Sequence, residues 1–138
     1  MPIRRHCPAA LACVLFMATG ACANIAPRCA TGEQAVVDER LYFGTQRPGG
    51  EVSGPEWADF VEHAIAAGFP DGFTTWPAQG QWRNEDGQAV REASHVLAVV
   101  HRDDSAGEAA IAAIIASYKA RFDQESVLRV RTPACMAL

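Results

Sequence analysis

The spacing of hydrophobic positions along the chain changes between a period of two residues and a period close to four. Residues 35–44 are rich in Val, Leu, Tyr and Phe, which predicts a β-strand. On such a strand Leu41 and Phe43 share one face, whereas Arg40 and Tyr42 share the other.

A long hairpin follows the same two-residue period. Residues 73–82 favour a strand, and Pro77 places it at a sheet edge or at a bulge because proline cannot donate to a ladder. Asp86 and Gly87 form a strong turn signal, after which residues 88–101 return. The end of this return is nearly all apolar, as in a central strand with both faces at least partly covered.

The last strand is predicted over residues 125–131. Leu128 and Val130 lie on one face of it, and Val127, Arg129 and Arg131 lie on the other.

Two segments have helical periodicity instead. Ser53 and Glu56 have the spacing of a capping box, and Ser105 and Glu108 repeat that spacing before the second segment. Each start is followed by an apolar stripe at helical spacing. The stripes consist of Trp57, Phe60, Val61, Ala64 and Ile65 in the first helix and of Ile111, Ile114, Ile115, Tyr118 and Phe122 in the second.

The predicted order is β-α-β-β-α-β. Its simplest compact solution is an α+β, ferredoxin-like split β-α-β sandwich, with a four-stranded antiparallel sheet and two helices on one face. In that topology the first and last strands are neighbours. Cys29 precedes the first strand and Cys135 follows the last, so the topology predicts that these two cysteines form a disulfide.

The N-terminal segment has the layout of a secretory signal peptide. A basic start at Arg4 and Arg5 precedes an apolar run over residues 9–18, which is too short to span a bilayer stably. The predicted organisation is a signal peptide (secretory or lipoprotein) over residues 1–23, an irregular lead-in over 24–36 and a single ferredoxin-like domain over 37–138.

Two fates of this segment stay open. Cleavage before Asn24 would release the domain, whereas the stretch before Cys22 resembles a bacterial lipobox, in which Cys22 is lipidated. Either fate predicts an exported protein, periplasmic or extracellular. Contact with a membrane is expected only through a lipid anchor.

Charge and motifs exclude several classes of function. Loss of Arg4 and Arg5 with the signal segment changes the formal charge from −4 to −6, and such an acidic domain is not expected to bind nucleic acid. No complete phosphate-loop or nucleophile motif is present, so no cofactor is predicted. His95 and His101 are separated by roughly 20 Å of strand, too far to share a metal, and no metal site is expected.

The sheet face away from the helices is the surface most worth testing. Alternation along the strands assigns to it Arg40, Tyr42, Arg129, Arg131, His95, Leu97, Val99 and His101, and Trp82 extends it. Three interpretations compete: a solvated face, a homo-oligomer interface, and a pocket for a small-molecule ligand. We select Trp76, Trp82, Arg40 and Arg129 as ligand or interface residues.

The favoured function is a small binding or interaction module that homo-oligomerises. The alternative is a cofactor-independent enzyme with a pocket for a small hydrophobic or anionic substrate. Its candidate catalytic residues are Tyr42, Arg83 and His101, with His101 as base and Arg83 as anion holder.

Five blocks of the sequence resemble an uncharacterised bacterial family of small exported proteins and lipoproteins, a domain of unknown function. They are RLYFG (40–44), FPDGFT (69–74), AQGQWR (78–83), HVLAVVH (95–101) and YKARFDQESVLRV (118–130). The resemblance covers about Cys29 to Cys135. It implies an exported domain with paired flanking cysteines, and it implies no activity or catalytic residue.

Overall fold

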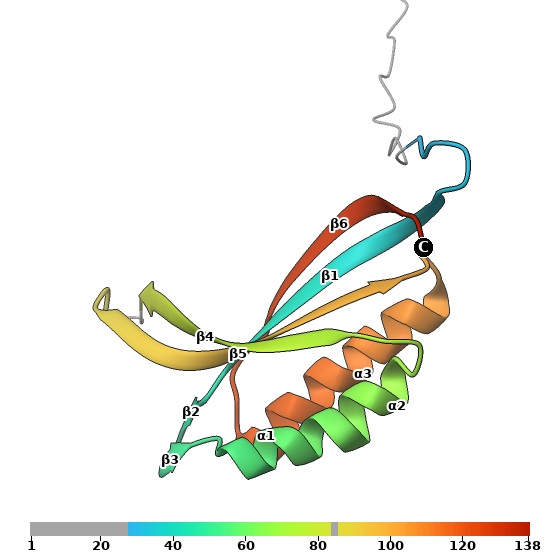
Figure 1. Cartoon of the computed structure of the whole chain (residues 1–138). Coiled ribbons are helices and arrows are strands. Elements are labelled where there is room, and N and C mark those ends of the chain that lie inside the picture. The colour runs from blue at the N-terminus through green and yellow to red at the C-terminus, as the bar shows by residue number, and fades with distance from the viewer. Residues whose placement is uncertain (1–27, 84–85) are drawn as a thin grey trace, which may run out of the picture.

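The computed structural model describes residues 28–83 and 86–138. The predicted signal segment and the lipidation candidate Cys22 lie outside the described residues. Four strands form one antiparallel sheet in the order β4-β5-β1-β6 (Figure 1). They are β1 Gln34–Gly44, β4 Thr74–Arg83, β5 Ala89–His101 and β6 Leu128–Met136.

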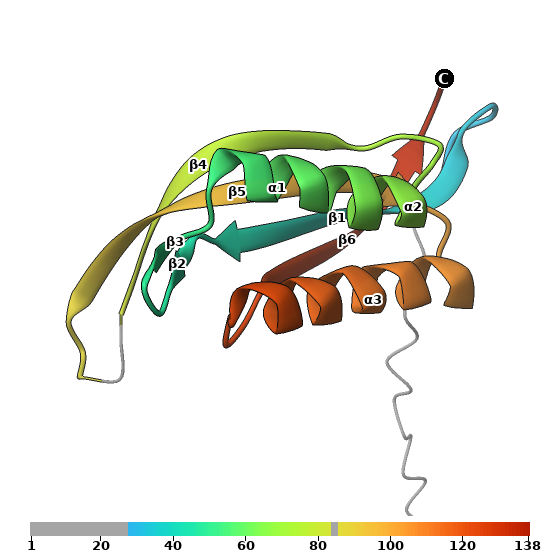
Figure 2. The ribbon, with the colours of Figure 1, turned by 90° about the horizontal axis from the view of Figure 1, so that it is seen from below.

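The helices lie on one face of this sheet, as Figure 2 shows from below. The first helical segment is continuous through three parts, α1 Gly54–Phe60, the π-helical η1 Val61–Ile65 and α2 Ala66–Gly68, and the second is α3 Ser105–Phe122. A small two-stranded sheet, β2 Gln46–Arg47 with β3 Gly50–Glu51, precedes α1. The predicted ferredoxin-like arrangement is confirmed, with β4, which contains Pro77, at an edge.

One of the two predicted helix caps is confirmed. The Ser53 side chain accepts from the backbone of Glu56, whose carboxylate accepts from the Ser53 backbone. The second prediction is wrong: Asp104, not Ser105, is the N-cap of α3, and its Oδ1 accepts from the Gly107 N–H at 2.9 Å. Glu108 therefore takes no part in the cap, and its carboxylate accepts a hydrogen bond from Arg129 of strand β6.

An aromatic core joins the helices to the sheet. Phe43 of β1 packs against Phe60 and Tyr118 with ring centroids 6.0 and 4.6 Å apart, and all three residues are fully buried. The Tyr118 hydroxyl donates to the Gly44 carbonyl at 2.8 Å, which satisfies a polar group inside an apolar region. Burial raises the pKa of Tyr118 far above its ordinary value, so the hydroxyl stays protonated.

Leu97 and Val99 of β5 face the helices, contrary to the predicted face. Leu97 lies opposite Leu41 and Val99 opposite Glu39, and residues opposite each other in an antiparallel pair share a face. His95 and His101 have the same parity, and His95 stacks on Trp57 of α1 at 4.2 Å. The prediction failed because Val96 to Val100 is apolar at every position, so alternation cannot fix the parity.

The parity of β6 is also opposite to the prediction. Arg129 lies opposite Leu41 and Arg131 opposite Glu39, so both arginines are on the helix side of the sheet. Leu128 and Val130 therefore face away from the helices. Charged residues could turn inward here because Glu39 is buried beside them.

Candidate functional site: the open sheet face and its cavity

The sheet face opposite the helices, here called the open face, carries an apolar row across all four strands. Strand register aligns Trp76, Val96, Tyr42 and Leu128 in that order. Trp76 is 41% exposed and Leu128 is 61% exposed, whereas Val96 between Trp76 and Tyr42 is only 1% exposed. The large side chains of this row therefore cover Val96 of β5, while much of their own apolar surface stays exposed to solvent.

The apolar character continues beyond that row. Val130 and Val100 lie on the same face and are 42% and 45% exposed. Arg40 and Asp38 of β1 interrupt the apolar surface and pair with each other at 3.2 Å. In the described part of the chain, every exposed large hydrophobic residue except the C-terminal Leu138 belongs to the open face, and no described helix covers it.

A cavity of about 690 Å³ lies where the open face meets the β4–β5 hairpin. Two loops close its sides, one around β2 and one between α3 and β6. The lining residues are Tyr42, Gly44, Gln46, Arg47, Pro48, Gly80, Gln81, Trp82, Glu92, Ser94, Asp123, Gln124, Glu125, Ser126 and Leu128.

The cavity is hollow because small residues form part of its lining. Gly44 lies opposite Ser94, and Gly80 lies opposite Glu92, so little side-chain volume fills the space between Tyr42 and the hairpin. The Glu92 carboxylate occupies the place of a side chain at position 44: a Cβ built on Gly44 would lie 2.8 Å from its Oε1.

The electrostatic character of the cavity is acidic. Glu92, Asp123 and Glu125 line it, and none of their three carboxylates has an ion pair or hydrogen bond to another described residue. The single lining guanidinium, Arg47, is held by both oxygens of Glu56 at 2.8 and 2.9 Å. Its positive charge is thus already matched outside the cavity.

The Glu56 carboxylate that holds Arg47 is itself strongly stabilised in its charged form. Hydrogen bonds from Ser53, and then from Arg47, lower the pKa of Glu56 to about 2. Glu56 therefore stays charged, and keeps Arg47 paired, well below neutral pH.

The structure does not assemble the predicted catalytic group. Tyr42 lines the cavity, but Arg83 lies opposite Ala89 at the hairpin end of β5 and donates to the Gly87 carbonyl at 2.8 Å. His101 lies at the other end of β5, roughly 40 Å of strand from Ala89. Of the two predicted tryptophans, Trp82 lines the cavity and Trp76 lies outside it.

A buried charge cluster on the helix side was missed by sequence reasoning. Glu39 is fully buried and accepts two hydrogen bonds from Arg129, one of them at 2.8 Å. Arg129 also donates to Glu108 at 2.9 Å, and these bonds raise the pKa of the guanidinium and lower that of the Glu108 carboxyl. Arg131 contacts both carboxylates, at 3.5 and 3.2 Å.

His101 completes this cluster, which explains why it is no exposed base. Its side chain is 7% exposed, its Nδ1–H donates to the Arg102 carbonyl at 2.6 Å, and its Nε2 lies 3.7 Å from Glu39 without a hydrogen bond. Gly107 of α3 closes over the ring, since a Cβ there would lie 2.2 Å from Nδ1. A glutamate at the parity of Leu41 was the available sequence signal for this cluster.

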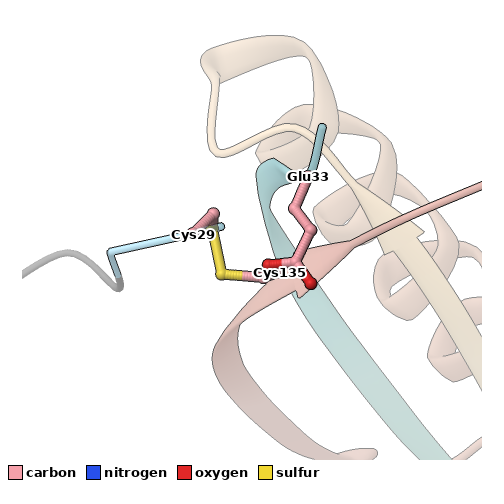
Figure 3. A group of neighbouring side chains, drawn as sticks. All are labelled: Cys29, Glu33 and Cys135. Atoms are coloured by element: carbon pink, nitrogen blue, oxygen red, sulfur yellow. A yellow bond between two sulfur atoms is a disulfide. The ribbon is translucent and has the colours of Figure 1, made fainter. Parts of the chain in front are cut away.

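The predicted disulfide is present between Cys29 and Cys135, with an S–S distance of 2.05 Å (Figure 3). Glu33 lies beside it, and the three potential ligand atoms are within 4.8 Å of one another. The sulfurs are bonded to each other, so neither is a thiolate ligand, and Glu33 accepts from the Ala30 N–H at 2.9 Å. The group therefore acts as a covalent and hydrogen-bonded tie at the start of β1.

A model of the family described as "Protein of unknown function (DUF3574)" matches residues 38–138. The chain belongs to the DUF3574 family. This confirms the resemblance to an uncharacterised domain family that the sequence blocks indicated. A search of curated proteins gave no match.

Two solved structures have a fold similar to this DUF3574 chain. A phage SAM lyase in complex with S-methyl-5'-thioadenosine has a TM-score of 0.56 at 15% identity, over 81% of this chain and 95% of that one. A phage SAM lyase in the apo state has a TM-score of 0.55 at 17% identity, over 74% and 89%. At these identities the likeness shows the fold alone.

Proposed function

We propose that this protein is a small binding module that self-associates through the open face of its sheet. The observation that carries the proposal is the collection of exposed apolar side chains on that face, led by Trp76, Leu128, Val100 and Val130. A sheet with one layer of helices leaves its second face to solvent, where polar residues are the norm. Contiguous exposed apolar surface instead marks an interaction site.

The charges on this face favour a second copy as the partner. Arg40 and Asp38 neighbour each other, on the same strand, within the apolar surface. In a two-fold packing of identical faces each residue meets the same patch of the other copy, so Arg40 of one chain can pair with Asp38 of the next. Such an exchange would bury the apolar rows without leaving an unpaired charge.

Export to the bacterial envelope is part of the same proposal. The disulfide between Cys29 and Cys135 supports it, because disulfides persist in oxidising compartments. The signal-like sequence of residues 1–23 supports it independently. Within the described residues, no helix is long and apolar enough to cross a membrane. Mass spectrometry of the mature protein tests both fates: a chain starting at Asn24 excludes the anchor on Cys22.

Self-association is tested by light scattering coupled to size-exclusion chromatography across a concentration series. Trp76→Glu and Val130→Glu should each shift the population toward the monomer, because each buries a charge in the proposed interface. Ala113→Glu, at an exposed position of α3 on the other side of the molecule, is the matched control and should leave the distribution unchanged.

Two results would contradict this function. A strict monomer at the highest soluble concentration excludes self-association. An oligomer that survives both open-face substitutions shows that the copies meet elsewhere, for example by pairing of the β6 edges.

The second function, a cofactor-independent enzyme, keeps one supporting observation, the cavity that contains Tyr42. The similar fold of a phage SAM lyase makes its reaction a direct first assay. The purified protein is incubated with SAM, and formation of S-methyl-5'-thioadenosine is followed by chromatography, with Tyr42→Phe as comparison. No product above the protein-free rate removes this version of the enzyme.

A further inference from the structure

We propose that the cavity between Tyr42 and Trp82 is a binding site for a small organic cation with an apolar or aromatic body. The site is formed within one chain, so the inference rests on the cavity lining and not on self-association. It also requires no reaction.

The walls of the cavity supply the apolar part of the recognition. Tyr42 and Leu128 project from neighbouring strands on one side, where their register places them directly opposite each other. Trp82 comes from the hairpin, and it is 48% exposed in the chain as it stands. Aromatic faces around a space of about 690 Å³ suit a ligand with a flat or compact apolar body.

The charge of the lining selects a cation. Three carboxylates and one guanidinium line the cavity, and the guanidinium of Arg47 is engaged by Glu56. Of the three carboxylates, we expect Glu92 to be the main partner of the cation, because it is partly buried and its carboxylate has no ion pair or hydrogen bond to another described residue. A cation bound near Glu92 would form an ion pair with its carboxylate and cation–π contacts with the rings of Tyr42 and Trp82.

The shape of the lining supports this placement. Gly44 leaves room for the Glu92 carboxylate, since any side chain at position 44 would contact it. Gly80, directly opposite Glu92, keeps the neighbouring strand equally free of side-chain volume. Glu92 therefore shares the cavity lining with the two aromatic residues Tyr42 and Trp82, while Asp123 and Glu125 add negative potential from the loop between α3 and β6.

Three probes of similar body and different charge test the site: benzyltrimethylammonium, benzyl alcohol and benzenesulfonate. Each is titrated by calorimetry into the purified, disulfide-bonded protein, and NMR follows the indole N–H signal of Trp82. We expect the cation to bind at least about tenfold more tightly than the alcohol, and the anion to bind most weakly.

Two substitutions locate the binding. Glu92→Gln keeps the shape of the side chain and should reduce affinity for the cation by about tenfold while leaving that for the alcohol unchanged. Trp82→Leu should weaken both probes. Glu62→Gln, an exposed carboxylate of η1 outside the cavity, is the control, and circular dichroism checks that each variant is folded.

The proposal is overturned if the cation fails to bind at about 10 mM, or binds no better than the alcohol. It is equally overturned if cation affinity survives Glu92→Gln in the folded variant. Self-association can fail without affecting these outcomes, because a monomer retains the complete cavity.

Discussion

Replacement of Glu39 by glutamine tests the physical role of the buried charge cluster. Glu39 is fully buried in a central strand, where it accepts two hydrogen bonds from Arg129 and lies near Arg131 and His101. Glutamine has nearly the same volume, but it removes the negative charge and replaces one acceptor oxygen by a donor. The substitution therefore changes the electrostatics of the cluster without opening a cavity.

The expected loss of stability is about 3 kcal/mol. Removing one member of a buried ion pair costs about 3–5 kcal/mol, because the other charge is left without compensation. Two features of the cluster reduce that cost. Arg129 is 29% exposed at its side chain, and it keeps Glu108 as a partner. The lower end of the range is thus appropriate.

Equilibrium unfolding in urea measures this loss. A decrease of about 3 kcal/mol lowers the midpoint by roughly 1–3 M urea for the slope typical of small domains. Glu62→Gln, the same chemical change at an exposed position, should leave the midpoint nearly unchanged. A Glu39→Gln protein with the stability of this control would refute the view that the cluster is tightly coupled.

Three further predictions test local features. Ser53→Ala removes the N-cap of α1 and should cost about 1 kcal/mol in the same unfolding assay. Tyr118→Phe leaves the Gly44 carbonyl without its donor and should cost about 1–2 kcal/mol, whereas a neutral result would mean that water replaces the hydroxyl. Burial lowers the pKa of His95, so an NMR titration should find it below about 6.5. The unfolded chain then binds a proton at His95 more readily than the folded chain does, so protonation favours unfolding. The contribution of His95 to stability is therefore complete above about pH 6.5 and falls as the pH decreases below it. A measured value above 6.5 would contradict its burial against Trp57.

The topology could be predicted from the sequence because several local signals agree. Periodicity gave the order of elements, the Ser53 cap and Pro77 marked a helix start and an edge strand, and the order then placed Cys29 beside Cys135. Each signal depends on residues close in sequence or on a rule of connection. None requires knowledge of which side chains meet in space.

The cavity could not be predicted in the same way. Its lining comes from four separate stretches of the chain, and its hollow depends on Gly44 of β1 and Gly80 of β4, two strands that lie on either side of β5. Glycine in a strand indicates close approach or a bulge, but it does not say that a pocket results. Tyr42 and Trp82 were selected as conspicuous residues, and only the register brings them to the same cavity.

The inverted strand β6 links the failed face prediction to the proposed function. A hydrophobic side normally packs inward, so Leu128 and Val130 would be expected under the helices and Arg129 and Arg131 in solvent. The structure reverses both pairs, because Glu39 provides a buried partner for the arginines. The cluster fixes this register, since a slip of one residue would separate Arg129 from Glu39 and turn its charge toward the open face. The ion pairs of Arg129 and Arg131 with Glu39 hold these arginines on the helix side of β6, so Leu128 and Val130 must lie on the open face. The apolar surface on that face is thus a consequence of the fold, and it is the surface through which the proposed self-association would take place.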